Sequence, residues 1–278
     1  MIIYGSELAL RYKADIREKV NKYKEEGKRI PKLGVILVGD NPASVSYVKG
    51  KRKACEDTGM AFELKELKDT VSQDELIAEI EKWNDDETID GILVQLPLPE
   101  GIDENAVIEH IDHKKDVDGL TSYNAGKLFL GEDGFVPCTP LGVMAILKEM
   151  NVDLEGKNAV VIGRSSLVGL PVSKLLLNKH ATVTVCHSRT KNLKEIASRA
   201  DVLVVAIGKA RFINHEYVKE GAFVIDVGVN RVDGKLCGDV DFDDVIDKVS
   251  MITPVPKGVG PMTIAMLMNN VLKAYEER

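Results

Sequence analysis

The sequence predicts an α/β protein with two domains, and three observations lead to that prediction. Short runs rich in Val, Ile and Leu alternate with longer amphipathic or charged segments, which is the pattern of proteins built on parallel sheets. The 278 residues correspond to about two domains of roughly 150 residues each. Prolines at 137–140 interrupt helix and strand alike and predict a domain boundary, and a second crossing at 254–258 would return the last helix to the first domain.

Strands are expected where the apolar runs are short. The segment at 62–67 alternates apolar and charged side chains, whereas the other runs are nearly all apolar and should be buried within parallel sheets. The expected strands are residues 33–38, 62–67 and 91–96 in the first half and residues 159–162, 182–186, 202–207 and 223–227 in the second.

Capping residues and three-to-four spacing of apolar residues predict helices between these strands. Asn41 is a capping residue, and it is followed by a proline that suits the first helical position. Ser72 and Glu75 form a capping-box pattern ahead of an apolar helical face. The last helix is expected over residues 262–276, with a Met-rich face of the kind that packs in cores.

Composition excludes several classes of function. There are 44 acidic and 37 basic residues, a formal net charge of −7, so we expect no binding to nucleic acid or to an anionic membrane surface. The longest stretch without a charged residue, 258–272, is too short and too rich in Gly and Pro to span a bilayer, and the charged first 20 residues predict no signal peptide. The four cysteines lack metal-site or redox-pair spacing, which predicts reduced core residues and a cytoplasmic protein without a bound metal.

A glycine-containing loop follows the expected strand at 159–162 and precedes a helix. This order of strand, glycine turn and helix can aim backbone N–H groups at a pyrophosphate. The fingerprint is altered, because Ser165 stands where the middle glycine of G-x-G-x-x-G would be and one extra residue precedes Gly169. On this motif alone, dinucleotide binding and an ordinary β-α turn both remain open.

The end of the next strand favours NADP over NAD. An NAD site usually has Asp or Glu there to bind the ribose 2′-hydroxyl, but this strand is followed by His187, Ser188 and Arg189. The Ser188 hydroxyl, with Arg164 and Arg189, suits a 2′-phosphate. For Arg189 a solvated loop charge is the alternative. Small residues after two later strands, Gly208 and Gly228, suit a planar ring lying close to the backbone, although ordinary turns would use them too.

Polar residues of the first half could form a second part of the site. Tyr47 and Lys51 share one helical face, and a desolvated lysine can act as a base or proton shuttle, although the neighbouring basic residues also fit a solvated face. Gln95 follows an expected parallel strand, at the sheet edge where ligands bind, or it is a surface turn residue. Asp118 lies in a turn sequence, and its carboxylate could grip an amino-pyrimidine edge.

Taken together, these segments resemble the methylenetetrahydrofolate dehydrogenase/cyclohydrolase family. The matching segments follow the family's order over nearly the whole chain, and their combination is highly specific although no single one would suffice. They are Tyr47-Val48-Lys49-Gly50-Lys51, Val94-Gln95-Leu96-Pro97-Leu98-Pro99, Lys115-Asp116-Val117-Asp118-Gly119, Pro137-Cys138-Thr139-Pro140, residues 163–171 and residues 253–263.

The resemblance implies a fold and two reactions. Residues 1–138 and 261–278 would form a folate-binding catalytic domain and residues 139–260 a Rossmann-like NADP domain, with folate in the cleft between them. The reactions would be NADP-linked oxidation of 5,10-methylenetetrahydrofolate to the 5,10-methenyl cation and hydrolysis of that cation to 10-formyltetrahydrofolate. The family also implies a homodimer that works in one-carbon metabolism and purine biosynthesis.

Each candidate site residue receives a role from the resemblance. Lys51 would be the catalytic lysine that assists water attack and proton transfer, with Gln95 hydrogen-bonded to it and Tyr47 stacked on the folate. Asp118 would anchor the pterin. Val229 would lie near the nicotinamide ribose, and Gly260 and Pro261 would line the folate cleft. The adenosine phosphates would be bound by Gly163, Arg164, Ser165 and Ser188.

Two positions depart from the family pattern. Lys257 replaces a glycine that usually precedes Gly258, and Ala210 replaces a common proline.

Two other functions remain as alternatives at this point: a two-domain dehydrogenase of another small molecule, such as a shikimate-type enzyme, and an NADP-sensing module without catalysis. Turnover of methylenetetrahydrofolate would separate all three.

Overall fold

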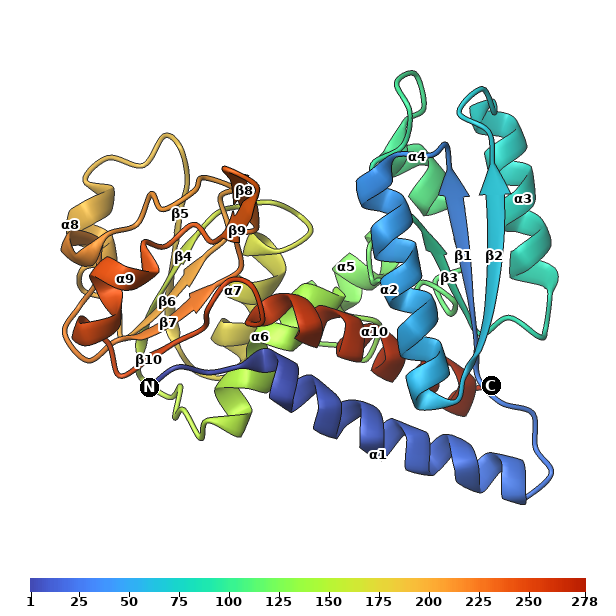
Figure 1. Cartoon of the computed structure of the whole chain (residues 1–278), viewed down its shortest axis with the longest axis horizontal. Coiled ribbons are helices and arrows are strands. Elements are labelled where there is room, and N and C mark those ends of the chain that lie inside the picture. The colour runs from blue at the N-terminus through green and yellow to red at the C-terminus, as the bar shows by residue number, and fades with distance from the viewer. The chain divides into compact units, whose positions relative to one another are not determined.

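The computed structural model describes every residue from Met1 to Arg278. The chain forms two compact units (Figure 1). The three-stranded unit comprises residues 10–138 and 264–278, and the five-stranded unit comprises residues 1–9 and 139–263. No helix is long and apolar enough to cross a membrane.

The three-stranded unit is built on a parallel sheet of order β2-β1-β3. The path from β1 through α2 to β2 runs one way across the sheet, and the path through α3 to β3 runs back. Right-handed crossovers therefore place α2 and α3 on opposite faces. The elements are β1 (Lys32–Val38), α2 (Pro42–Thr58), β2 (Ala61–Leu67), α3 (Gln73–Asp85), β3 (Gly91–Val94), α4 (Glu104–Glu109), α5 (Ser122–Leu130) and most of α1 (Gly5–Glu25) and α10 (Val259–Glu276).

Local sequence explains where these helices begin. The Asn41 side chain accepts hydrogen bonds from the amides of Ala43 and Ser44, so α2 starts at the proline as predicted. Ser72 and Glu75 form the predicted capping box at the start of α3. The α3 helix then packs its apolar face, including Leu76, Ile80 and Trp83, on the sheet.

The five-stranded unit has a parallel sheet of order β10-β7-β6-β4-β5. The chain moves outward from β4 to β5 and then returns to β6 on the other side of β4. This reversal creates a topological switch point at the carboxyl ends of β4 and β6, where open α/β sheets bind ligands. The elements are α6 (Cys138–Glu149), β4 (Asn158–Ile162), α7 (Gly169–Asn178), β5 (Thr182–Cys186), α8 (Leu193–Ala197), β6 (Val202–Val205), η1 (His215–Tyr217), β7 (Phe223–Asp226), β8 (Asn230–Val232), β9 (Lys235–Cys237), α9 (Phe242–Val245), η2 (Ile246–Lys248) and β10 (Met251–Ile252).

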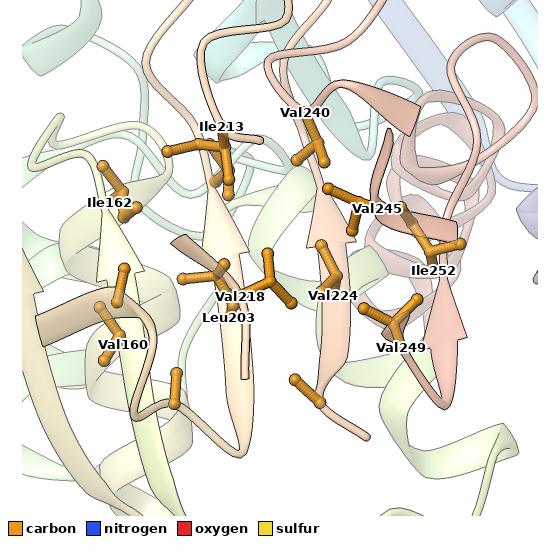
Figure 2. Close-up of a cluster of buried hydrophobic side chains, with 14 of the residues drawn as sticks. Val160, Ile162, Leu203, Ile213, Val218, Val224, Val240, Val245, Val249 and Ile252 are labelled. Carbon is orange, nitrogen blue, oxygen red and sulfur yellow. The ribbon is translucent and has the colours of Figure 1, made fainter. Parts of the chain in front are cut away.

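One face of this sheet carries a continuous apolar core (Figure 2). Val160 of β4, Leu203 of β6 and Val224 of β7 point into it and are fully buried. Side chains from the segments after β6 and β9, such as Ile213 and Val240, extend the core to the arrowhead end of the strands (Figure 2). The loops at that end are therefore anchored by apolar packing as well as by hydrogen bonds.

All the expected strands are present, with small differences at their ends. The strands β3, β6 and β7 end one or two residues earlier than expected. The long helix α1, the β8–β9 hairpin and the two-residue β10 were not predicted. All four cysteines are buried and unbridged, as predicted.

The two proline-rich segments lead into helices. Residues 137–140 do not form an extended linker, because α6 already begins at Cys138 and includes Pro140. Likewise α10 begins at Val259, three residues before the expected start, and includes Pro261. Proline is tolerated in the first helical turn, because the amide N–H groups there have no partner within the helix.

Candidate active site

A lysine-glutamine pair lies in the three-stranded unit where a helix and a strand end meet. The α2 helix carries Lys51, and Gln95 directly follows β3. The Lys51 Nζ donates a hydrogen bond of 2.6 Å to Gln95 Oε1. Gln95 Nε2 donates to the carbonyl oxygen of Leu96 at 2.6 Å, and this fixes which amide atom faces the lysine. Sequence reasoning expected this pair, and the structure brings it together.

Burial changes the chemistry of Lys51. Desolvation lowers the pKa of its ammonium group below the ordinary value, and the negative charge of Asp118 opposes that shift only in part. A lysine with a lowered pKa has a larger neutral fraction near neutrality and can exchange a proton with a reacting group. The half-buried position of Lys51 and its bond to Gln95 favour the proton-exchange role over a solvated face, and that role stays a prediction.

Asp118 lies close enough to Lys51 for the two charges to interact. Burial raises the pKa of its carboxyl group, while the Lys51 charge and a hydrogen bond with Cys138 act in the opposite direction. Few protein donors satisfy this carboxylate, which leaves it able to bind a ligand.

The neighbouring Asp116 is bound quite differently. Its carboxylate accepts hydrogen bonds from the amides of Leu120 and Thr121, from the Thr121 hydroxyl and from Asn124 Nδ2, at 2.7 to 3.1 Å. Asp116 is therefore a structural residue that shapes the turn before α5. Of the two aspartates in this turn, only Asp118 is left for ligand binding.

Two residues near Asp118 were missed by sequence reasoning. The Cys138 thiol donates to the carbonyl oxygen of Val117 at 3.4 Å and also interacts with the Asp118 carboxylate. Asn270 of α10 donates to the carbonyl oxygens of Val117 and Val136 at 2.8 and 3.1 Å. The Pro-Cys-Thr-Pro motif could have drawn attention to Cys138, whereas nothing local marks Asn270.

Tyr47 lies one turn before Lys51 on α2, and 56% of its surface is exposed. An exposed aromatic ring beside a polar cluster can stack on a planar ligand. The position agrees with the expected stacking role, which stays a prediction.

The loop after β4 in the five-stranded unit depends on glycine at two positions. Gly163 has a φ of +129°, and a Cβ there would overlap the carbonyl oxygen of Ala206. A Cβ at Gly169 would overlap the backbone of Gly163, so the first turn of α7 packs directly on the strand end. This close packing is the role of the glycines in dinucleotide-binding turns.

Ser165 replaces the middle glycine and serves the loop itself. Its Oγ accepts hydrogen bonds from the amides of Val168 at 3.2 Å and Gly169 at 3.4 Å. The Arg164 and Ser165 side chains are exposed at the N-terminus of α7. The loop therefore combines a helix N-terminus, a hydroxyl and a cation, all of which favour phosphate groups.

The turn after β5 presents the residues expected to bind the 2′-phosphate. The amide of His187 donates to Thr190 Oγ1 at 2.8 Å, and the amide of Arg189 donates to His187 Nδ1 at 3.2 Å. This turn leaves the side chains of Ser188 and Arg189 exposed. The amide of Gly163 donates to the carbonyl oxygen of Cys186 at 2.9 Å, which holds the phosphate loop beside the turn.

Three further predicted positions lie after β7 and at the start of α10. Val229 follows β7 and is 53% exposed, as expected of a residue that faces a ligand. Gly260 is exposed and Pro261 is half-buried in the first turn of α10. The ligand roles of these three residues stay predictions.

The two departures from the family pattern are both exposed. Lys257 adopts a φ of +82°, which is a strained conformation for any residue other than glycine, and its carbonyl oxygen accepts a hydrogen bond from the amide of Ser6. Ala210 is exposed in the loop after β6.

Comparison with known proteins extends these observations. Residues 3–118 match the tetrahydrofolate dehydrogenase/cyclohydrolase catalytic domain, and residues 137–278 match the NAD(P)-binding domain of the same family. The bifunctional protein FolD of Bacillus cytotoxicus is 55% identical over 275 residues, which cover 99% of this chain and 96% of that protein.

Several solved structures are similar over the whole chain. The bifunctional FolD methylenetetrahydrofolate dehydrogenase/cyclohydrolase from Campylobacter jejuni shares 49% identity with a TM-score of 0.98, covering 100% of this chain and 99% of that one. The Trypanosoma brucei dehydrogenase-cyclohydrolase, solved with NADP and an inhibitor, shares 38% identity with a TM-score of 0.95, covering 100% and 97%. The chain belongs to the tetrahydrofolate dehydrogenase/cyclohydrolase family.

Proposed function

We propose that this protein oxidises 5,10-methylenetetrahydrofolate to 5,10-methenyltetrahydrofolate with NADP and hydrolyses the product to 10-formyltetrahydrofolate. The main support for the proposal is a half-buried Lys51 bonded to Gln95 beside Asp118, in a chain that also contains a glycine-dependent phosphate loop. The full-length identity to a bifunctional relative supports both activities. Family membership makes a shikimate-type enzyme or a non-catalytic NADP sensor the weaker alternative.

The hydrolysis is assigned to the Lys51 cluster. Water adds to the methenyl carbon, and the neutral Lys51 amine takes the proton that the water loses. The bond from this carbon to N5 then breaks, and the proton of the new hydroxyl group passes to N5, which leaves the formyl group on N10. Gln95 holds the amine through its Oε1 atom, and this orients the lone pair. Asp118 anchors the pterin and Tyr47 stacks on it, because a carboxylate can bind an amino-pyrimidine edge and an exposed ring can cover a planar one.

NADP is assigned to the five-stranded unit. The close approach that Gly163 and Gly169 permit, together with the exposed Arg164 and Ser165, fits a pyrophosphate group. Ser188 lies in a turn without a carboxylate, which fits a 2′-phosphate. We assign Val229, whose side chain is exposed, to the nicotinamide ribose. When bound, NADP accepts the hydride that the methylene carbon loses.

The domain roles follow from these assignments. Residues 1–138 and 261–278 are assigned to folate binding and catalysis, with Gly260 and Pro261 lining the folate site. Residues 139–260 are assigned to NADP binding. The match of residues 137–278 to an NAD(P)-binding family model supports the NADP assignment of residues 139–260.

We further propose a cytoplasmic homodimer that acts in one-carbon metabolism and purine biosynthesis. The β8–β9 hairpin supports self-association, because Val232 and Leu236 are 42% and 39% exposed on a two-stranded element whose outer edges pair with no other strand. Light scattering of the purified protein tests this, since a monomer at micromolar concentration would contradict it.

The experiment that tests the function supplies methylenetetrahydrofolate with NADP and follows two signals. Formation of NADPH reports the oxidation, and the ultraviolet absorbance of the methenyl compound reports its formation and hydrolysis. Both signals should change with substoichiometric protein, and NADP should react faster than NAD. NADP binding without turnover of the folate would contradict the proposal.

A further inference from the structure

A buried carboxylate holds the loop that follows β6 in the five-stranded unit. Asp239 is fully buried, and it accepts hydrogen bonds from three consecutive backbone amides, those of Ile207 at 2.6 Å, Gly208 at 3.0 Å and Lys209 at 2.7 Å. Asn230 Nδ2 donates to the same carboxylate at 2.9 Å. Three successive amides that converge on one anion form the concave arrangement that many proteins use to bind phosphate. Here the protein's own aspartate occupies it.

A second carboxylate supports the first. Asp226 ends β7, is 3% exposed, and accepts hydrogen bonds from the amides of Gly228, Asp239 and Val240 at 2.9 to 3.1 Å. The packing around both groups is tight, because a Cβ at Gly228 would overlap the Asp239 carboxylate and a Cβ at Gly238 would overlap that of Asp226. The two aspartates and two glycines therefore form one rigid backbone arrangement.

This arrangement lies at the carboxyl ends of β6 and β7. Figure 2 shows Ile213 near the arrowhead of β6 and Val240 near that of β7, and the Ile213 amide donates to the Asp239 carbonyl oxygen at 3.0 Å. The loop that Asp239 holds begins directly after Ala206, whose carbonyl oxygen lies against Gly163 of the phosphate loop. Asp239 is thus connected through one short loop to the switch point between β4 and β6.

We infer that Asp239 is a positioning residue for cofactor binding, which acts by fixing the 206–209 loop against Gly163. The inference rests on the proposed assignment of NADP to this unit. Because the three loop amides are already bound to Asp239, the loop keeps its shape before the cofactor arrives, and binding does not have to order it. Asp226 acts one step further away, by holding the backbone of Asp239.

The test compares Asp239→Asn with a matched control. In Asp239→Asn an amide nitrogen faces backbone N–H donors, so the loop loses accepted hydrogen bonds and becomes mobile. The control is Asp201→Asn, since Asp201 lies in the same unit and accepts the amide of Asn158 at the opposite, amino end of the sheet. Titration calorimetry with NADP alone measures affinity without catalysis.

We expect the dissociation constant for NADP to rise about tenfold or more in Asp239→Asn. Asp201→Asn should lower the melting temperature and leave NADP affinity unchanged. Hydrolysis of the methenyl compound, assayed without NADP, should keep its KM and kcat in both variants, because the Lys51 cluster lies in the other unit. Equal NADP affinity in Asp239→Asn and Asp201→Asn would overturn the inference.

A milder variant keeps the test decisive if Asp239→Asn does not fold. Asn230→Ala removes the side-chain donor that orients the Asp239 carboxylate, so the loop amides are held less firmly and NADP affinity should fall by about twofold to fivefold at an unchanged hydrolysis rate. Unchanged affinity in this variant would then contradict the inference. A wild-type protein without NADP-linked oxidation would instead contradict the proposed function, so the two failures are distinguishable.

Discussion

The Lys51 cluster is half-buried and the Asp226–Asp239 pair is fully buried, and the two sets of polar groups differ in how many donors and acceptors satisfy them. Lys51 and Asp118 have few protein partners, and burial moves the pKa of each toward its neutral form. Asp239 is saturated by three backbone amides and an asparagine. Buried groups that lack partners are available for chemistry, whereas saturated ones hold the backbone.

The largest effect that would test this contrast is the loss of hydrolysis in Lys51→Met. Removing a proton acceptor at the reacting atoms should lower kcat for the methenyl compound by about 10² to 10⁴. The free energy of unfolding should stay within about 1 kcal/mol of the parent value, because the lysine is desolvated and not part of a saturated network. Urea unfolding and a steady-state hydrolysis assay measure the two quantities.

Two aspartates of one turn provide a second test. Asp116→Asn should lower the free energy of unfolding by about 3 kcal/mol, because several donors around that carboxylate lose their acceptor. Asp118→Asn should change stability by about 1 kcal/mol or less and raise the KM for the folate about tenfold. The opposite pattern, a stable Asp116 variant and an unfolded Asp118 variant, would refute the distinction.

Stability should depend on pH through Asp226. Burial raises the pKa of this carboxyl group to about 7, whereas in the unfolded chain it has its ordinary value of 3.8. Between these values the folded protein binds a proton that the unfolded chain has lost, so this group's contribution to stability is full below pH 4 and falls as the pH rises to 7. The slope is at most about 1.4 kcal/mol per pH unit. Urea unfolding at several pH values measures it, and a slope that persists unchanged in Asp226→Asn would contradict the assignment.

The smallest expected effect is at Lys257. Its positive φ costs any side chain about 1 to 2 kcal/mol, while glycine loses part of that advantage through its flexible unfolded state. Lys257→Gly should therefore raise the free energy of unfolding by about 0.5 to 1 kcal/mol. Thermal unfolding followed by circular dichroism measures it, with Lys257→Ala as the control that keeps the strain.

Sequence alone predicted the elements whose causes are local. The apolar runs, the Asn41 cap and the Ser72–Glu75 capping box each depend only on residues close together in the sequence, and the structure contains all of them. The family resemblance paired Lys51 with Gln95 in advance, whereas the residues alone left a solvated face and a surface turn open. The parallel order of the sheets then brings the strand ends together.

Long-range partners could not be predicted. Asp239 binds amides 30 to 32 residues away, and Asn270 binds a carbonyl 153 residues away. Asp116 and Asp118 look alike in the sequence, since only their tertiary donors separate them. The start positions of α6 and α10 were mispredicted for a different reason. Proline interrupts a helix in its interior but is tolerated in the first turn, so the sequence alone does not say which of the two a proline marks.

The measurement that most directly tests the role of the Lys51 cluster is a progress curve of Lys51→Met supplied with methylenetetrahydrofolate and NADP. NADPH should form while the methenyl compound accumulates far above its wild-type level, because oxidation continues and hydrolysis is lost. If NADPH forms and the methenyl compound is cleared at the wild-type rate, Lys51 is not the residue that drives hydrolysis.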